Sequence, residues 1–287
     1  MRLLCATDLS SRSDRAVRRA AILAKETGAE LVLLSVVDDD RPELLLASER
    51  RDVTHQLADQ ARGMPEMQGL NPRLRVEVGD PFDAIIRAAD EEKADLVVMG
   101  EHRRRLLRDM FIGTTIERVM RLGGRPVLMV NRPSERPYRQ VLAAVDISEP
   151  SASALRAATR LGFAKRGDLT VFHAFLQPGR GSMVLAGLTS EAIAGHVTAT
   201  AVQARTDVSQ YLRGLDVDLG PQLPPIVVHE GTPAEALKET VARLSPDLVV
   251  MGTRAHGAIG RLLLGSTAEE ALRTLDCDVL AVPPDAE

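Results

Sequence analysis

The 287-residue sequence has little aromatic character, since Phe, Trp and Tyr together make up 2% of it and Trp is absent. Large rings therefore cannot fill a core, and the 45% of hydrophobic residues must do so mainly with Leu, Val, Ile, Ala and Met. Aliphatic cores of this kind are typical of parallel sheets that helices cover on both faces. The composition favours an α/β protein, and the length allows one large domain or two of ordinary size.

The sequence also has no excess of positive charge, and cysteine and long apolar runs are scarce. The formal net charge is −4, which gives no electrostatic reason to bind nucleic acid or an anionic membrane. Cys5 and Cys277 stand alone, without a CxxC or Cys/His pattern, which predicts buried thiols. No apolar stretch approaches the roughly 20 residues of a membrane span, and the first residues run into a strand pattern and not a signal peptide. We expect a cytoplasmic protein with no nucleic acid and no membrane as partner.

The chain contains one pattern twice. The first two strands of each copy align at a constant offset of 138, which places Asp8 opposite Asp146. The later segments align at an offset of 152, which places the Met-Gly pair ending at Gly100 opposite the one ending at Gly252. The second copy therefore has 14 extra residues, all between its second and third strands. Two constant offsets separated by one insertion indicate a duplicated domain.

Each copy predicts five short apolar strands that alternate with four amphipathic helices. In the first copy we expect strands at 3–7, 31–37, 74–78, 96–99 and 127–130, and helices near 11–27, 42–63, 81–92 and 114–122. The second copy repeats this order over 141–282, with a longer helix near 189–215 after a Gly-rich loop at 177–187. The alternation predicts right-handed βαβ units and a parallel sheet covered on both faces. The stretch 131–138, with its two prolines, predicts an exposed connector between domains at 1–133 and 138–287.

Chemistry-bearing residues gather where such a sheet binds ligands, beyond the carboxyl ends of strands where the strand order reverses. An aspartate ends the first strand of each copy, a glycine ends the fourth, and a Gly-Ser or Gly-Thr pair opens the last helix 13 residues later. A helix start presents unpaired N–H groups to an anion, and glycine allows close approach. A single pair would indicate an ordinary N-cap, but its repetition at equal spacing favours a phosphate site.

The stretch Val250–Glu269, the opening Val145–Ser148 and the close Cys277–Val282 resemble the universal stress protein family, and the resemblance covers nearly all of both halves. It implies two tandem Rossmann-like (adenine nucleotide alpha hydrolase-like) domains, each a five-stranded parallel sheet sandwiched by helices. It also implies ATP or another adenine nucleotide as ligand, with or without Mg²⁺. The implied binding residues are Asp146, Ala174, Met251, Gly252, Ala255, Gly265, Ser266 and Thr267 in the second half, and Asp8, Val36, Gly100, Gly113, Thr114 and Thr115 in the first.

Neither half reproduces the family's nucleotide motif, Gly-x2-Gly-x9-Gly-Ser/Thr, in full. The second glycine is Ala255 in one copy and Arg103 in the other. If that backbone must be left-handed, alanine costs roughly 1–2 kcal/mol, which weakens binding without forbidding it. Arg103 either clamps phosphates or fills the site and pairs with Glu101 and Asp109, and we favour the second alternative. The second half is therefore the better nucleotide-site candidate.

Three functions stay open: a nucleotide-binding stress-response regulator, a weak ATP hydrolase, and an interaction scaffold with vestigial nucleotide sites. The sequence has no SGGxDS, HIGH-type or GxxxxGK[ST] motif. Each half offers only a single carboxylate, Asp8 or Asp146, which is too few acidic ligands for an efficient phosphoryl-transfer site. We therefore assign no catalytic residue and no metal ligand set. The resemblance also implies pairing through fifth strands, here 127–130 with 279–282, and hence an intramolecular pseudo-dimer or a homodimer.

Overall fold

The computed structural model describes residues 1–40, 42–101, 114–133, 136–166, 168–177, 185–253 and 264–284. The first half contains β1 (Arg2–Ala6), α1 (Ser13–Thr27), β2 (Glu30–Val37), α2 (Glu43–Gly63), the short 3₁₀ helix η1 (Pro65–Met67), β3 (Arg73–Val78), α3 (Pro81–Glu91), β4 (Leu96–Gly100), α4 (Thr115–Leu122) and β5 (Val127–Val130). The second half contains β6 (Gln140–Ala144), α5 (Glu149–Arg160), α6 (Phe163–Arg166), β7 (Asp168–Phe175), α8 (Ser190–Gly214), β8 (Ile226–Glu230), α9 (Pro233–Leu244), β9 (Leu248–Gly252), α10 (Ser266–Thr274) and β10 (Asp278–Val282). The predicted alternation of strands and helices is confirmed.

Local sequence explains where the helices begin and end. Helix α1 ends at Gly28, whose φ of 67° is a left-handed conformation that glycine adopts without a steric penalty. Helix α3 begins with Pro81 behind Asp80, whose carboxylate caps the first turn. Helix α5 is capped in the same way by the side chain of Ser148. The two N-caps fix the first turns of α3 and α5 close beyond the strands that precede them.

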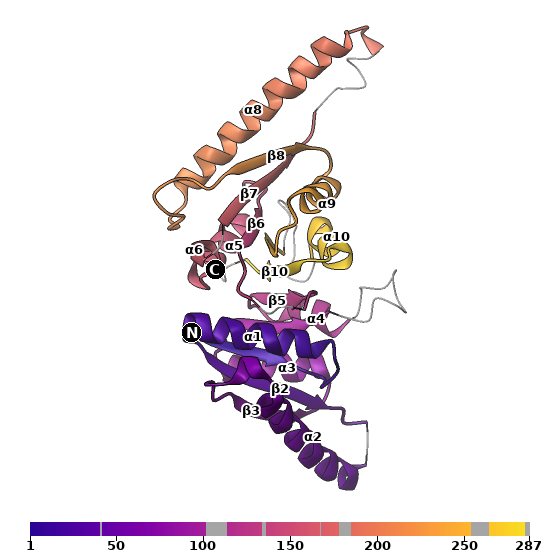
Figure 1. Ribbon diagram of the computed structural model, residues 1–287. Helices are drawn as coiled ribbons and strands as arrows, with labels where there is room; N and C mark the ends of the chain where they lie inside the picture. Colours follow the sequence, from indigo (N-terminus) through magenta and orange to yellow (C-terminus); the bar gives the residue numbers. More distant parts are fainter. Residues whose placement is uncertain are drawn as a thin grey trace.

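The strands of the described chain form one continuous sheet, in the order β3-β2-β1-β4-β5-β10-β9-β6-β7-β8 (Figure 1). Every pair within a half is parallel, whereas β5 and β10 are antiparallel, with Leu128 opposite Leu280. The predicted pairing of the fifth strands is confirmed, and it occurs within one chain. The two halves are thus related as the subunits of a pseudo-dimer that shares a single sheet.

Helices cover both faces of this sheet, as the sequence predicts. The core of one face contains side chains from α1, α2, α5, α6 and α8, and that of the other contains side chains from α3, α4, α9 and α10. Cys5 lies in the first core and Cys277 in the second, both fully buried. Burial raises the pKa of both thiols, that of Cys277 to about 12. The prediction of buried, unpaired cysteines is confirmed.

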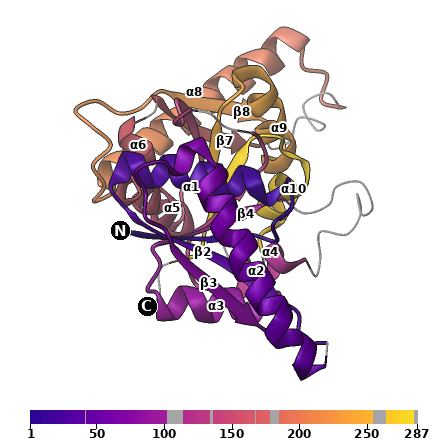
Figure 2. The same ribbon diagram turned by 60° about the horizontal axis from the view of Figure 1, so that its bottom comes forward.

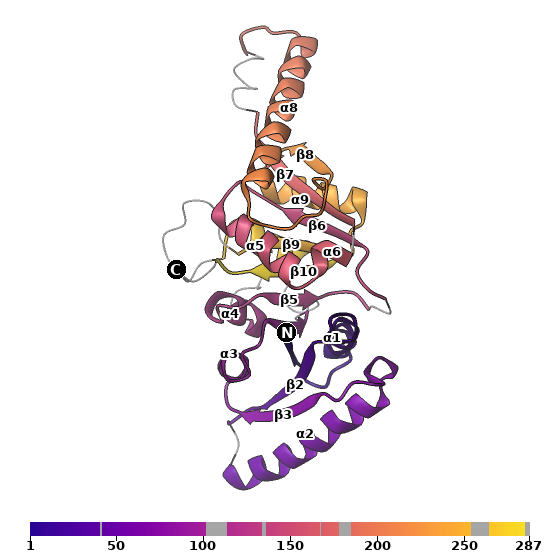
Figure 3. The same cartoon turned by 90° about the vertical axis from the view of Figure 1, so that its left-hand side faces the viewer.

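The longest helices, α2 and α8, lie at opposite ends of the molecule (Figures 1 and 3). Figure 2 brings α2 forward, where it crosses the outer strands β2 and β3 of the first half. Helix α8 has 25 residues against 21 in α2, so part of the insertion lengthens this helix. Most of the rest lies before α8, in the segment 176–189 that contains the predicted loop at 177–187, of which residues 178–184 lie outside the described residues. Among the described helices, none has the length and apolarity that crossing a bilayer requires.

The connector between the halves is anchored at both ends by Asp278, the first residue of β10. Its Oδ1 accepts the backbone N–H groups of Asn131 at 2.8 Å and Arg132 at 3.1 Å. Its Oδ2 accepts the hydroxyl of Tyr138 at 2.5 Å. Asn131 and Tyr138 are only 5% and 4% exposed, so the expectation of an exposed connector is wrong at its two ends. The reason is that a buried carboxylate needs donors, and these backbone and phenol groups supply them.

Arg19 of α1 completes this buried cluster from the first half. Its Nε lies 3.4 Å from Oδ2 of Asp278, and both side chains are almost fully buried, at 5% and 1% exposure. The guanidinium also stacks 3.7 Å from the ring centre of Tyr138 and donates to the carbonyl of Arg136 at 2.9 Å. Burial, and then the negative charge of Asp278, raise the pKa of Tyr138, so the phenol stays a donor. The seam between the halves therefore contains a desolvated ion pair whose members depend on each other.

We predict that Asp278→Asn lowers the free energy of unfolding by about 3–5 kcal/mol, because Arg19 would remain buried without its counter-charge. Urea unfolding followed by circular dichroism measures this change. Glu30→Gln is the matched control, since it breaks the exposed pair between Arg2 and Glu30, whose side chains are 34% and 71% exposed. That pair should contribute less than about 1 kcal/mol. Equal losses in the two variants would contradict the assignment of the seam as a buried electrostatic anchor.

Candidate functional site

The strand order reverses once in each half, and this reversal defines the candidate sites. In the first half the chain proceeds outward from β1 to β2 and β3, and then returns to the other side of β1 with β4 and β5. In the second half the same reversal lies between β6 and β9. The carboxyl ends of these two strand pairs are where an open parallel sheet offers backbone and loop groups to a ligand. Both predicted aspartates and both strand-ending glycines lie there.

A cavity of ≈ 250 Å³ lies at the reversal point of the first half. Four of the predicted residues line it, namely Asp8, Val36, Gly100 and Thr115. Leu34 and Ile85 add apolar wall beside Val36, while Ser10, Arg12 and Glu101 add polar groups near Asp8. An apolar wall facing a carboxylate suits the flat base and the hydroxyl groups of a nucleoside. The volume is just below the range of about 300–1,000 Å³ usual for small-molecule sites.

Asp8 and Asp146 lie in equivalent turns that serines hold in place. The backbone N–H of Ser10 donates to Asp8 Oδ1 at 3.0 Å. In the second half, Oδ1 of Asp146 accepts the hydroxyls of both Ser148 and Ser151, the latter at 2.6 Å. The pattern Asp-x-Ser-x-x-Ser occurs in both copies at the offset of 138, although sequence reasoning stopped at the first serine. The second serine, missed in each half, could have been found from that repeat.

The residue after each aspartate has an unusual backbone conformation. Leu9 and Ile147 have φ values of 60° and 59°, in the left-handed region that residues with a Cβ rarely adopt. For a β-branched residue such as Ile147 this conformation is a marked outlier. Strain of this kind is often found at functional sites, where neighbouring structure holds it in place. The conformation repeats in both halves at the aspartate turns, and it also repeats at Lys93 and Ser245, which follow α3 and α9.

Hydrogen bonding controls the ionisation of Asp8. Partial burial raises its pKa, but hydrogen bonds from Ser10 and Ser13, and then the positive charge of Arg12, outweigh burial and leave the pKa below its ordinary value. The carboxylate is therefore ionised at neutral pH and available as an acceptor. A ribose hydroxyl is a donor that such an acceptor can hold.

The strand-ending glycines have a packing role that the sequence could not distinguish from ligand approach. A Cβ on Gly100 would lie 3.0 Å from the carbonyl oxygen of Arg12, and one on Gly252 would lie 2.8 Å from that of Pro150. These carbonyls belong to the turns that open α1 and α5. Glycine thus lets each helix start directly against the fourth strand of its half, which brings the aspartate turn to the reversal point.

The beginnings of α4 and α10 differ between the halves. Thr114 caps α4, since its hydroxyl accepts the N–H of Glu117 at 3.3 Å. The ordinary N-cap therefore applies to the first half. Helix α10 begins behind Gly265, which has no side chain to cap it and whose N–H donates to the carbonyl of Thr253 at 2.7 Å. Ser266 is exposed and Thr267 half-buried at this start, so both can be reached from solvent.

The remaining predicted residues divide into placed and undescribed ones. Ala174 is half-buried on β7, where it pairs with His229 of β8, and Met251 is buried on β9 at 4% exposure. Gly113 and Ala255, and with them Arg103, lie outside the described residues. In the first half, Val36 occupies on β2 the position that Ala174 occupies on β7, and it reaches the cavity.

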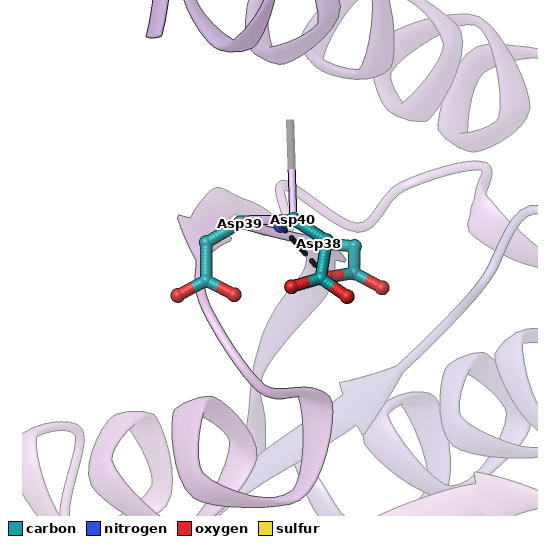
Figure 4. A group of neighbouring side chains, drawn as sticks. All are labelled: Asp38, Asp39 and Asp40. Carbon is teal, nitrogen blue, oxygen red and sulfur yellow. Dashed lines mark hydrogen bonds between the residues drawn. The ribbon is translucent and has the colours of Figure 1, made fainter. Parts of the chain in front are cut away.

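Three consecutive carboxylates after β2 form a cluster that the sequence analysis did not single out. The carboxylate oxygens of Asp38, Asp39 and Asp40 lie within 4.8 Å of one another, and the N–H of Asp40 donates to Asp38 at 3.2 Å (Figure 4). All three side chains are exposed. Exposed acidic turns of this kind are common without a metal, and the cluster carries no assignment.

The fold defines a tandem α/β protein with one strand-order reversal in each half, and comparison with known proteins identifies its family. Residues 1–131 and 137–283 both match the universal stress protein family, so the chain belongs to this family. Universal stress protein E homolog of Haemophilus influenzae is 24% identical over 94% of this chain and 92% of its own. Universal stress protein MJ0577 of Methanocaldococcus jannaschii is 24% identical over 46% of this chain and 94% of its own.

Solved structures agree with the tandem fold. The crystal structure of a universal stress protein from Archaeoglobus fulgidus covers 98% of each chain with a TM-score of 0.63 at 20% identity, which shows the fold alone. A universal stress protein solved in complex with cAMP matches 45% of this chain at 25% identity. That protein binds cAMP, but the TM-score of 0.34 is too low to transfer its ligand to this chain.

We predict that Gly252→Ala destabilises the protein by about 1–3 kcal/mol, because the new methyl group would overlap the carbonyl of Pro150. Gly195→Ala is the control: it lies exposed within α8, where an added Cβ meets nothing within 4 Å. Alanine should stabilise that helical position by roughly 0.5–1 kcal/mol. Thermal and urea unfolding of the two variants would measure both signs. A neutral Gly252→Ala would refute the packing role.

Proposed function

We propose that the chain is a nucleotide-binding regulatory protein that takes an adenine nucleotide at the reversal points of its two halves, 1–133 and 138–287. The observation that carries the proposal is the cavity of the first half, where Asp8, Val36, Gly100 and Thr115 meet. The apolar wall receives the base, and the ionised carboxylate of Asp8 accepts a ribose hydroxyl. The same elements recur at the sequence offsets of 138 and 152 in the second half, with Asp146 and Ala174 in equivalent positions.

The second half is the better candidate for holding phosphates. In the first half, the Thr114 hydroxyl already accepts a hydrogen bond from one of the backbone N–H groups in the first turn of α4. Helix α10 starts with Gly265, Ser266 and Thr267 and has no side-chain cap, so its front amides and two hydroxyls suit an anionic group. A nucleotide would thus be held by Asp146 at the ribose and by the start of α10 at the phosphates. Magnesium is not required by this arrangement, in which amides and hydroxyls meet the phosphate charge.

Native mass spectrometry of the freshly purified protein, followed by calorimetric titration with ATP, ADP, AMP and cyclic AMP, tests the proposal. We expect Gly265→Glu to weaken binding in the second half at least about ten-fold, because it places a carboxylate where the phosphates would lie. Asp8→Ala tests the first half independently. Gly195→Glu adds the same charge on exposed α8 and should leave nucleotide binding unchanged.

The other two functions predict different results in the same experiment. An interaction scaffold with vestigial sites would show no affinity at millimolar nucleotide, which would sink the proposal. An ATP hydrolase would release phosphate at a rate that scales with protein concentration and disappears in the Asp8→Ala or Asp146→Ala variants. Binding without turnover is the outcome expected here.

A further inference from the structure

A second cavity lies on the seam between the halves, and none of the residues assigned to the candidate nucleotide sites lines it. It has a volume of ≈ 490 Å³ and we call it the seam groove. It lies at the edge of the sheet where β4 and β5 begin and where β10 ends. Its wall from the second half is α5, which packs over β9 and β10 near β5 (Figure 3). The side chains used below are Asp95, Arg125, Pro126, Arg156, Ala157 and Arg160.

The pseudo-two-fold relation gives the seam groove a counterpart on the other side of the sheet's midline. Asp95 of the first half corresponds to Asp247 of the second by the offset of 152. Each accepts the backbone N–H at the start of its half, Asp95 from Arg2 at 2.8 Å and Asp247 from Gln140 at 3.1 Å. The two grooves are therefore equivalent places in a duplicated structure.

Among the residues that the structure describes, the counterpart groove is filled and the seam groove is open. The connector runs through the counterpart, where Arg136 pairs with Asp247 at 3.3 Å and Asp278 pairs with the buried Arg19. At the seam groove, the position equivalent to Asp278 is Pro126, and the position equivalent to Arg19 is Ala157. No connector passes here because the chain links the halves only once. The duplication thus leaves one solvent-accessible cleft in the place of a packed one.

The open groove is rich in positive charge. Three arginines line it, against the single carboxylate of Asp95, in a chain whose net charge is −4. Asp95 is already engaged by the N–H of Arg2. The positive groups come from both halves, Arg125 from the turn before β5 and Arg156 and Arg160 from α5. Interfaces between domains are common places for ligand sites.

Two of the three arginines already have carboxylate partners, which hold them in place. Arg125 donates to Asp90 at 3.0 and 3.2 Å and to the carbonyl of Ala94 at 2.6 Å, and these bonds fix the orientation of its guanidinium group. Arg156 donates to Glu149, an exposed carboxylate outside the groove lining. Exposed pairs of this kind contribute at most about 1 kcal/mol and exchange readily for a better anion. Among the described residues, Arg160 has no carboxylate within ion-pair distance, and its side chain is exposed.

We propose that the seam groove binds a small multivalent anion of the phosphate class, held between Arg125 of one half and Arg156 and Arg160 of the other. Guanidinium groups bind phosphate oxygens in pairs, and three of them around one cleft favour a ligand with more than one charged group. The volume fits a molecule of that size. The carbonyl of Ala157, which would repel an anion, is already occupied by the N–H of Leu161 at 2.9 Å. A ligand there would bridge the two halves and tighten the seam.

Calorimetric titration of the full chain with inorganic tripolyphosphate tests this proposal. We expect binding that weakens about ten-fold in Arg160→Gln, and again in Arg125→Gln, because each removes a charge-assisted contact. Arg243→Gln is the matched control, since Arg243 is also exposed in the last turn of a helix but lies on α9, outside the groove. It should bind as the unaltered protein does. Bound tripolyphosphate should also raise the midpoint of thermal unfolding of the unaltered protein.

Two results would contradict the proposal that the seam groove binds an anion. In the first, Arg160→Gln and Arg125→Gln bind tripolyphosphate as well as Arg243→Gln does, or none of the proteins binds it at millimolar concentration. In the second, Gly265→Glu abolishes the binding while the groove variants retain it, which would move the anion to the nucleotide site of the second half. The seam groove and the nucleotide sites are tested by separate variants. Failure of the anion proposal therefore leaves the nucleotide proposal to be judged by its own variants, and the reverse also holds.

Discussion

The antiparallel pairing of β5 with β10 is the constraint on which the rest of the structure depends. Each of these strands is the last of its half, and pairing them leaves no open edge in the middle of the sheet. It also makes the strands of the two halves run in opposite directions. The carboxyl ends of β1 and β4 therefore point to one edge of the sheet and those of β6 and β9 to the other. The two candidate nucleotide sites cannot share a ligand, and any coupling between them passes through the seam.

The seam combines apolar strand pairing with one concentrated electrostatic anchor. Leu128 and Leu280 face each other across the sheet, while Asp278 gathers a guanidinium, a phenol and two backbone N–H groups. Buried ion pairs contribute little net stability compared with apolar residues, but they penalise any arrangement that separates their members. The cluster thus specifies how the halves dock and where the connector runs. Strand pairing alone would leave the register of two similar apolar strands weakly specified.

The sequence predicted the duplication and the alternation of strands and helices in each half, because these follow from periodicity and from two constant offsets. It could not predict contacts between distant residues. Arg19 and Asp278 are far apart in the chain, so the buried ends of the connector were predicted as exposed. Gly100 likewise allowed two explanations, ligand approach or packing, and only the position of the turn before α1 distinguishes them. The second serine of each aspartate turn was present in the repeat and was overlooked.

A tandem chain can do what a dimer of identical subunits cannot, because each of its two pseudo-equivalent positions mutates separately. In an identical dimer, the carboxylate at Asp278 would occur at both grooves of the seam; here its counterpart is Pro126, and one groove stays open. The nucleotide sites have diverged in the same manner, since Thr114 caps one helix while Gly265 leaves the other without a side-chain cap. The aspartate turns, in contrast, keep the same strained backbone in both halves. The two copies therefore differ around an aspartate turn that both contain, and the shared sheet fixes the position of each.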